Sequence, residues 1–258
     1  MSAAEPPTPP SPLTAVLLDL DDTLVPWQTP AHWQWAWRPR GPLLSERHVR
    51  AALKRSLHQW DRRRWEILTG GAPPADEAAY RGFLGWTLTE IAGHPLAPEE
   101  AKAVVDRFLK PAYESERYDD SGPLLDALAR RGVRVGVVSQ LPLEASRLAL
   151  RRAGLPETLL VPLAEGTLPI PAAAGFKAAV AHLGAKPRST LYVGDLFWSD
   201  VRAAARAGLV SVLIDRSDAA GRITGPKIRS LAEVPGLLDH PPGDSPEPAE
   251  PGPSVPGP

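Results

Sequence analysis

The chain has 258 residues, a length that fits one large α/β domain or a core with a smaller inserted module. Its 29 basic and 30 acidic residues give a formal net charge of −1, so no global field favours nucleic acid or an anionic membrane surface as a partner. The absence of cysteine excludes disulfides, thiolate catalysis and cysteine zinc sites, and it favours a cytoplasmic location.

Both ends of the chain are rich in proline and small polar residues. Residues 1–13 lack the basic start and the apolar stretch of a signal peptide, so we expect a disordered leader. Residues 239–258 offer few backbone donors and little apolar surface, and we expect a disordered Pro-rich tail. No apolar run reaches the roughly 20 residues needed to span a bilayer, so no membrane partner is expected.

Short apolar runs indicate the strands of a buried sheet. The first run, TAVLLDL at residues 14–20, stops abruptly at acidic residues, as a strand buried on both faces of a parallel sheet does. Similar runs follow at 133–139, 159–163, 190–193 and 209–214, and they alternate with helical patterns at 124–131, 143–153, 172–183 and 200–207. The alternation predicts an α/β fold with a doubly wound, Rossmann-like parallel sheet, built from residues 14–24 and 118–238.

Residues 25–117 break this alternation and predict a helical insertion after the first strand. Ser45 can cap a helix that places Val49, Leu53, Leu57 and Trp60 on one face. Asp76 can cap a second helix, and Pro98 can open a third that runs through Leu109. Six of the eight tryptophans lie between Trp33 and Trp86, where we expect them to pack a core rather than line a substrate pocket.

Polar residues follow three of the expected strands at their carboxyl ends, where open parallel sheets bind ligands. They are Asp19 and Asp21 after the first strand, Ser139 and Gln140 after the second, and Asp195 and Asp200 after the strand at 190. Carboxylates suit Mg²⁺, and an Asp-x-Asp pair can divide into a nucleophile or ligand and a proton donor and acceptor. Ser139 and the backbone donors after it can hold phosphoryl oxygens. Each pattern alone is more often a turn or a helix cap.

Together, LLDLDDTL at 17–24, VVSQ at 137–140 and YVGDLFWSD at 192–200 resemble motifs I, II and IV of the haloacid dehalogenase superfamily. The resemblance spans about residues 14–235, and the helical insertion lies where members with a type-one cap carry theirs. It implies that Asp19 is the nucleophile that becomes an aspartyl-phosphate and that Asp21 is the general acid and base.

The same resemblance implies a Mg²⁺ site. Asp19, the backbone carbonyl of Asp21 and Asp195 are its implied ligands, and Asp200 is a supporting carboxylate near the metal. Asp21 also favours phosphate transfer, because the dehalogenases that share this pattern lack an acid there; their leaving halide needs no proton.

Motif III of the family is a lysine, commonly followed by proline, that neutralises charge between nucleophile and phosphate. The spacings to Phe176 and Asp195 place it at residue 170, which is Ile170 and is followed by Pro171. A lost charged hydrogen bond costs about 2 to 4 kcal/mol of transition-state stabilisation. Lys177 is the nearest lysine that could replace it, but it lies two helical turns further on. An arginine of the cap, from Arg62 to Arg64, could also enter the site, although a run of three arginines is more typical of a solvated helix face.

Two functions therefore remain open from the sequence. The first is a Mg²⁺-dependent phosphatase that acts on a small phosphorylated metabolite, with a phosphomutase as a variant of it. The second is a catalytically impaired binding or regulatory protein, which Ile170 favours. The four carboxylates favour the enzyme, because such a cluster of like charges is costly without a metal. No pattern indicates the substrate or the oligomeric state.

Overall fold

The computed structural model describes residues 12–26, 30–40, 45–68, 77–109, 117–139, 143–161, 173–216 and 225–242. The expectations for Asp76, Gln140, Ile170 and nearly all of the leader and the tail fall outside these residues; Leu13, at the end of the expected leader, is buried in the core. Within the described part of the chain, no helix is long and apolar enough to cross a membrane.

Five parallel strands form one sheet in the order β2-β1-β3-β4-β5. Their bounds are Ala15–Asp19 for β1, Arg134–Val138 for β2, Thr190–Gly194 for β3, Val210–Ile214 for β4 and Lys227–Ile228 for β5. In register, Leu18 of β1 lies beside Val137 of β2 and Val193 of β3. Because every strand runs the same way, all the carboxyl ends share one edge of the sheet.

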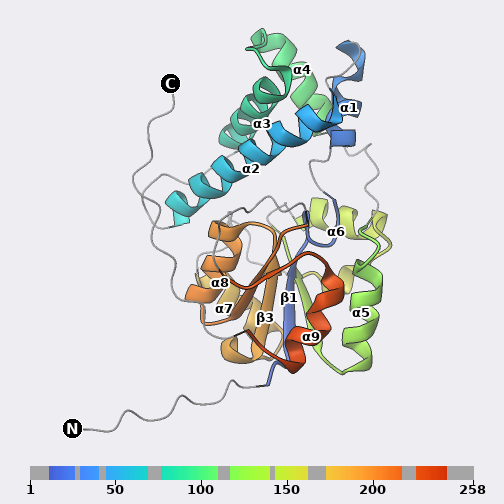
Figure 1. Ribbon diagram of the computed structural model, residues 1–258, viewed down its shortest axis with the longest axis vertical. Coiled ribbons are helices and arrows are strands. Elements are labelled where there is room, and N and C mark those ends of the chain that lie inside the picture. The colour runs from blue at the N-terminus through green and yellow to red at the C-terminus, as the bar shows by residue number, and fades with distance from the viewer. Residues whose placement is uncertain are drawn as a thin grey trace, which may run out of the picture.

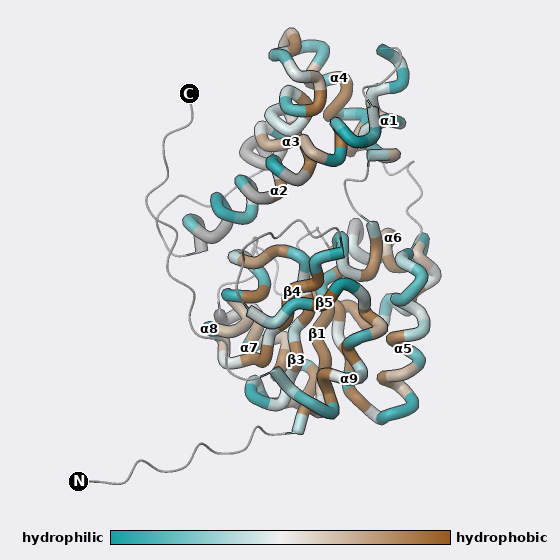
Figure 2. Tube along the Cα trace, in the orientation of Figure 1, coloured by the Kyte–Doolittle hydropathy of each residue, from teal (hydrophilic) through white to brown (hydrophobic). Residues whose placement is uncertain are grey.

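Helices cover both faces of the sheet, so the expected doubly wound fold is confirmed (Figure 1). One face packs against α5 (Ser121–Arg130), α6 (Leu143–Arg152) and α9 (Val234–Asp239), and the other against α7 (Ala173–His182) and α8 (Ala203–Arg206). Val16 and Leu18 join the first cluster while Leu17 joins the second, as the alternation of side chains along a strand requires. Figure 2 shows the resulting apolar interior.

Two details of the core differ from the expectations. The run at 159–163 does not form a strand in its described part: a 3-10 turn (Glu157–Leu159) leads into a single bridge between Leu160 and Val137. Pro162, which has no backbone N–H to give to a ladder, is the sequence signal against a longer strand. The helix expected at 200–207 starts earlier, with a π-helical turn, η4 (Phe197–Arg202), that continues into α8.

In the described part of the insertion after β1, four helices form the cap, which lies over the carboxyl edge of the sheet (Figure 1). They are α1 (Pro30–Trp37), α2 (Glu46–Leu68), α3 (Glu77–Ala92) and α4 (Pro98–Phe108), with a 3-10 turn, η1 (Arg38–Arg40), after α1. Ser45 caps α2, since its Oγ accepts from the His48 amide at 3.4 Å, and Pro98 opens α4. Sequence patterns indicated only three of these helices; α1 was missed.

The cap has a hydrophobic core of its own, separate from the two clusters that cover the sheet. Trp33 is fully buried and stacks on Phe108 at a centroid distance of 4.2 Å, and Trp60 stacks on Phe83 at 4.6 Å. These contacts confirm that these tryptophans pack the interior of the cap.

His32 is a buried titratable group within this cap core. It is 4% exposed, its ring stacks on Phe108 at 3.9 Å, and its Nε2 lies 3.0 Å from the Phe108 carbonyl oxygen. Burial lowers the pKa of His32 to about 4, although the hydrogen bond to Phe108 opposes the shift. The ring is therefore neutral near pH 7 and donates to that carbonyl.

We expect the cap to lose stability as the pH falls from about 6.5 to about 4. In that window the unfolded chain binds a proton on His32 and the folded chain does not, so the free energy of unfolding falls by about 3 kcal/mol. Urea unfolding of the cap, followed by tryptophan fluorescence at pH 7 and pH 5, measures the loss. His32→Gln should flatten this pH dependence and His94→Gln, at an exposed cap histidine, should not; an equal slope in both variants contradicts the assignment.

Candidate active site

A tight turn keeps the residues after β1 at the carboxyl edge of the sheet. The amides of Leu24 and Val25 both donate to the Leu20 carbonyl at 3.0 Å, and the Asp22 amide donates to the Val25 carbonyl at 2.7 Å. Asp22 adopts the left-handed region at φ 54°, which aspartate tolerates better than most residues. The turn holds the backbone of Asp21 beside Val25, two residues after the end of β1.

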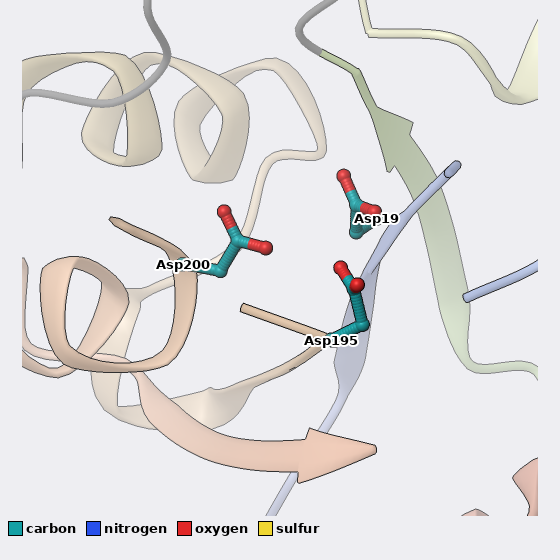
Figure 3. A group of neighbouring side chains, drawn as sticks. All are labelled: Asp19, Asp195 and Asp200. Carbon is teal, nitrogen blue, oxygen red and sulfur yellow. The ribbon is translucent and has the colours of Figure 1, made fainter. Parts of the chain in front are cut away.

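Three carboxylates converge at this edge. Asp19 ends β1, Asp195 follows β3 and Asp200 stands on η4, and each offers an oxygen within 4.8 Å of the other two. Figure 3 shows the three side chains arriving from different segments and pointing toward a common space. Asp19 and Asp200 are buried and Asp195 keeps part of its surface exposed. The side chain of Asp21 is not part of this triad.

Gly194 makes the close approach of Asp200 possible. A Cβ at position 194 would lie 2.8 Å from the side chain of Tyr192, closer than real Cβ atoms come, and 3.0 Å from Oδ2 of Asp200, which is a very tight contact. The same Oδ2 accepts from the Leu196 amide at 3.3 Å. A glycine is therefore required before Asp195 for steric reasons, because a side chain at position 194 would meet its neighbours.

The electrostatics of the triad call for a cation. Burial raises the pKa of Asp195 well above its usual range, and the charges of Asp22, Asp200, Asp61 and Asp21 raise it further. A bound divalent cation would offset this repulsion, and carboxylate oxygens are the ligands that Mg²⁺ prefers. The donor set of Asp19, Asp195 and Asp200 thus fits a hard divalent ion.

The other expected site residues are placed only in part. Ser139 follows β2 and is buried, one residue beyond Val138, which pairs with Asp19. It therefore lies at the same edge as the triad. Gln140 and Ile170 lie outside the described residues. Lys177 on α7 is exposed, as a lysine on a solvated helix face is.

Two of the three arginines considered as substitutes for the motif III lysine have a described partner on their own helix. Arg62 and Arg63 lie 3.9 Å and 3.5 Å from carboxylate oxygens of Glu66 on their own helix. The side chain of Arg64 is outside the described part.

Sequence reasoning missed two residues beside the triad. Asp61, on α2, is 3% exposed and accepts hydrogen bonds from the amides of Trp198 and Ser199 on η4 at 2.9 and 2.8 Å. Tyr118 donates from its hydroxyl to Oδ1 of Asp22 at 3.3 Å. Burial, followed by the charge of Asp22, raises the pKa of Tyr118 and keeps it a neutral donor. Neither belongs to a sequence pattern that marks a site.

A polar clamp fixes the turn after β1 to the end of β4. Both terminal nitrogens of Arg216 donate to the Asp120 carboxylate at 2.9 Å, and one also donates to the Thr23 carbonyl at 2.8 Å. Asp120 accepts further from the Ser230 hydroxyl at 2.7 Å. Burial alone would raise the pKa of Asp120, but the hydrogen bonds from Arg216 and Ser230 outweigh it and lower that pKa. The clamp supports the turn that carries Asp21.

Two relatives found by sequence comparison are phosphatases. A phosphoserine phosphatase from Thermus thermophilus is 29% identical over 153 residues, which are 58% of this chain and 59% of that protein. The aligned region thus spans less than two thirds of that relative. A ribulose-1,5-bisphosphate 5-phosphatase from Halopiger xanaduensis is 27% identical over 223 residues, which are 80% of this chain and 86% of that protein.

Solved structures show the same fold at lower identity. The L-2-haloacid dehalogenase of Xanthobacter autotrophicus superimposes with a TM-score of 0.63 at 17% identity, over 88% of this chain and 99% of that one. Residues 13–208 match the family described as haloacid dehalogenase-like hydrolase, a span that includes the triad and the cap. With the family match covering most of its length and the carboxylates gathered where its strands end, this chain belongs to the haloacid dehalogenase-like hydrolases.

Proposed function

We propose that the protein is a Mg²⁺-dependent phosphatase that hydrolyses small phosphomonoesters through an aspartyl-phosphate on Asp19. The observation that carries the proposal is the convergence of Asp19, Asp195 and Asp200 within 4.8 Å at the strand edge beneath the cap, with Asp21 two residues after Asp19. Both of the reported sequence relatives are phosphatases, which supports phosphate esters over haloacids as the substrate class.

In the proposed first step, the Asp19 carboxylate attacks phosphorus and the bond to the ester oxygen breaks. Asp21 gives its proton to that oxygen, so the product leaves as an alcohol. Ser139 and the backbone donors after it hold the non-bridging oxygens. Asp19, the Asp21 carbonyl and Asp195 would hold Mg²⁺, with Asp200 in support, and the ion would supply charge neutralisation between carboxylate and phosphate.

In the proposed second step, Asp21 takes a proton from a water molecule, whose oxygen attacks the phosphorus of the aspartyl-phosphate. The acyl–phosphate bond breaks, and inorganic phosphate and the Asp19 carboxylate are restored. The cap excludes bulk water until the covalent intermediate has formed. We assign residues 25–117 to this cap and residues 14–24 and 118–238 to the core, with specificity set by cap side chains.

The test is Mg²⁺-dependent release of phosphate from a broad panel of phosphate esters, compared with the Asp19→Asn variant. A parallel assay of halide release from a 2-haloacid covers the dehalogenase activity of the structural relative. Phosphate release alone supports the proposal, and halide release alone contradicts it.

Ile170 favours the second candidate, an impaired member that binds rather than hydrolyses phosphate esters. A folded chain that binds Mg²⁺ but releases neither product would support that candidate. In that case Ile170→Lys should restore turnover, because a cation beside the carboxylates stabilises the phosphoryl transition state.

Asp195→Asn should raise the Mg²⁺ concentration for half-maximal activity by roughly 10- to 100-fold, with partial rescue at high Mg²⁺. The substitution removes one anionic oxygen from the triad while keeping its size. Activity and thermal stability, each titrated with MgCl₂, measure the change. Asp126→Asn, at an exposed aspartate on α5, is the matched control; unchanged Mg²⁺ dependence in Asp195→Asn would refute the ligand role.

A further inference from the structure

Asp61 connects the cap to the segment that carries Asp200. Its two carboxylate oxygens accept from the amides of Trp198 and Ser199, one oxygen for each amide. These amides lie in the first turn of η4, where backbone N–H groups have no carbonyl partner within their own helix. The Asp61 carboxylate of the cap therefore accepts hydrogen bonds from backbone amides of the core.

The hydrogen bonds between Asp61 and the η4 amides are strong enough to influence the position of η4. Asp61 is 3% exposed, and burying a carboxylate is costly unless hydrogen bonds to it are made. Hydrogen bonds from amides to an ionised acceptor are about twice as strong as neutral ones. If the cap lifts, both bonds break together, and the amides and the carboxylate must return to water. The closed position of the cap and the conformation of η4 are thus energetically coupled.

Phe197 and Val201 pack against Leu213 of β4, so the η4 turn is also held from the core side. Two contacts within the turn support its conformation further. The Trp198 ring lies edge-on to Phe197 at 5.0 Å, and the Arg202 guanidinium lies 5.0 Å from the Trp198 ring centroid. Asp61 also restrains the backbone of Ser199, the residue directly before Asp200, through the hydrogen bond from the Ser199 amide. The Asp200 carboxylate then reaches back to the Leu196 amide at 3.3 Å.

We propose that Asp61 is a positioning residue: the closed cap holds η4 through the amides of Trp198 and Ser199, and this sets the Asp200 carboxylate beside Asp19 and Asp195. Asp61 also adds negative charge near Asp195, so a divalent cation in the triad favours the closed arrangement by offsetting that repulsion. The kinetic consequence rests on the proposed phosphatase function, whereas the structural consequence does not.

Hydrogen–deuterium exchange on the full chain tests the structural consequence. In Asp61→Ala, peptides that cover residues 196–202 should exchange roughly tenfold faster or more, because both amides lose their acceptor. Asp61→Asn keeps the size and one carbonyl acceptor, so its effect should be intermediate; it also serves if Asp61→Ala fails to fold. Glu46→Gln, at an exposed position on the same helix, should leave the exchange of residues 196–202 unchanged.

Two further measurements sharpen the test. MgCl₂ should slow exchange at residues 196–202 in the wild-type chain and less so in Asp61→Asn. In the phosphatase assay, Asp61→Asn should raise the Mg²⁺ requirement and lower kcat with little change in KM, since Asp61 is assigned no contact with substrate. An inactive wild type would reject the phosphatase proposal and leave the exchange result to decide on Asp61. Unchanged exchange at 196–202 in a folded Asp61→Asn overturns the inference.

Discussion

Asp19→Asn should reduce phosphate release by roughly 10⁴-fold or more, because an amide cannot form the acyl-phosphate on which both steps depend. The fold should remain intact. The side chain of Asp19 faces the other two carboxylates of the triad, and replacing it removes a repulsive charge without changing its volume. In the absence of Mg²⁺ the variant should therefore be at least as stable to urea as the wild type.

Steady-state phosphate release and urea unfolding measure these two effects, and intact-mass analysis after acid quenching detects the phosphorylated chain in the wild type. Asp126→Asn is the matched control for the change from carboxylate to amide. Activity of Asp19→Asn near that of the wild type, or a phosphorylated species in the variant, would remove Asp19 as the nucleophile.

Asp21→Asn should lower steady-state turnover by roughly 10²- to 10⁴-fold, the usual contribution of a general acid and base. The two steps should respond differently to the leaving group. With p-nitrophenyl phosphate the leaving phenolate needs little protonation, so phosphorylation of Asp19 should still proceed. Hydrolysis of the aspartyl-phosphate needs a base, so the intermediate should accumulate.

Stopped-flow absorbance should therefore show a burst of one p-nitrophenol per active site in Asp21→Asn, followed by slow turnover. An alkyl phosphate, whose leaving group requires a proton, should leave this variant largely unphosphorylated, as intact-mass analysis after acid quenching would show. Asp22→Asn makes the same substitution at the next residue of the turn and serves as the control. Its turnover on both substrates should stay within about tenfold of the wild type. Equal losses in Asp21→Asn on both substrates from the first turnover would contradict the assigned role.

The core and three of the site residues were predictable for a topological reason. Apolar runs locate parallel strands, and parallel strands bring their carboxyl ends to one edge, so Asp19, Asp195 and Ser139 had to be neighbours once the sheet was inferred. The run at 159–163 was wrongly predicted as a strand, because its apolar residues do not indicate how many of them pair with a neighbouring strand. Leu160 forms a single bridge to Val137. The α1 helix was missed although Pro30 stands at its first position, a known start signal.

The role of Asp61 could not be predicted from the sequence in this way. It lies in the run WDRRR, where an acid among arginines looks like a solvated helix face. Its contact depends on where the C-terminal third of a 23-residue helix lies over the core, which is decided by packing of the cap and not by any local pattern. The same holds for Tyr118, whose partner Asp22 is 96 residues away in the chain.

The separate hydrophobic core of the cap has a consequence for sequence divergence. None of the buried residues that cluster around Trp33 and Phe108 belongs to the clusters that pack the sheet, so substitutions among them can repack the cap without disturbing the carboxylate triad. Under the proposed function, in which cap side chains set specificity, substrate preference can then change while the carboxylates keep their positions. Asp61 limits this freedom at one point, but because it binds main-chain amides, the side chains at 198 and 199 can vary while an acid at 61 persists.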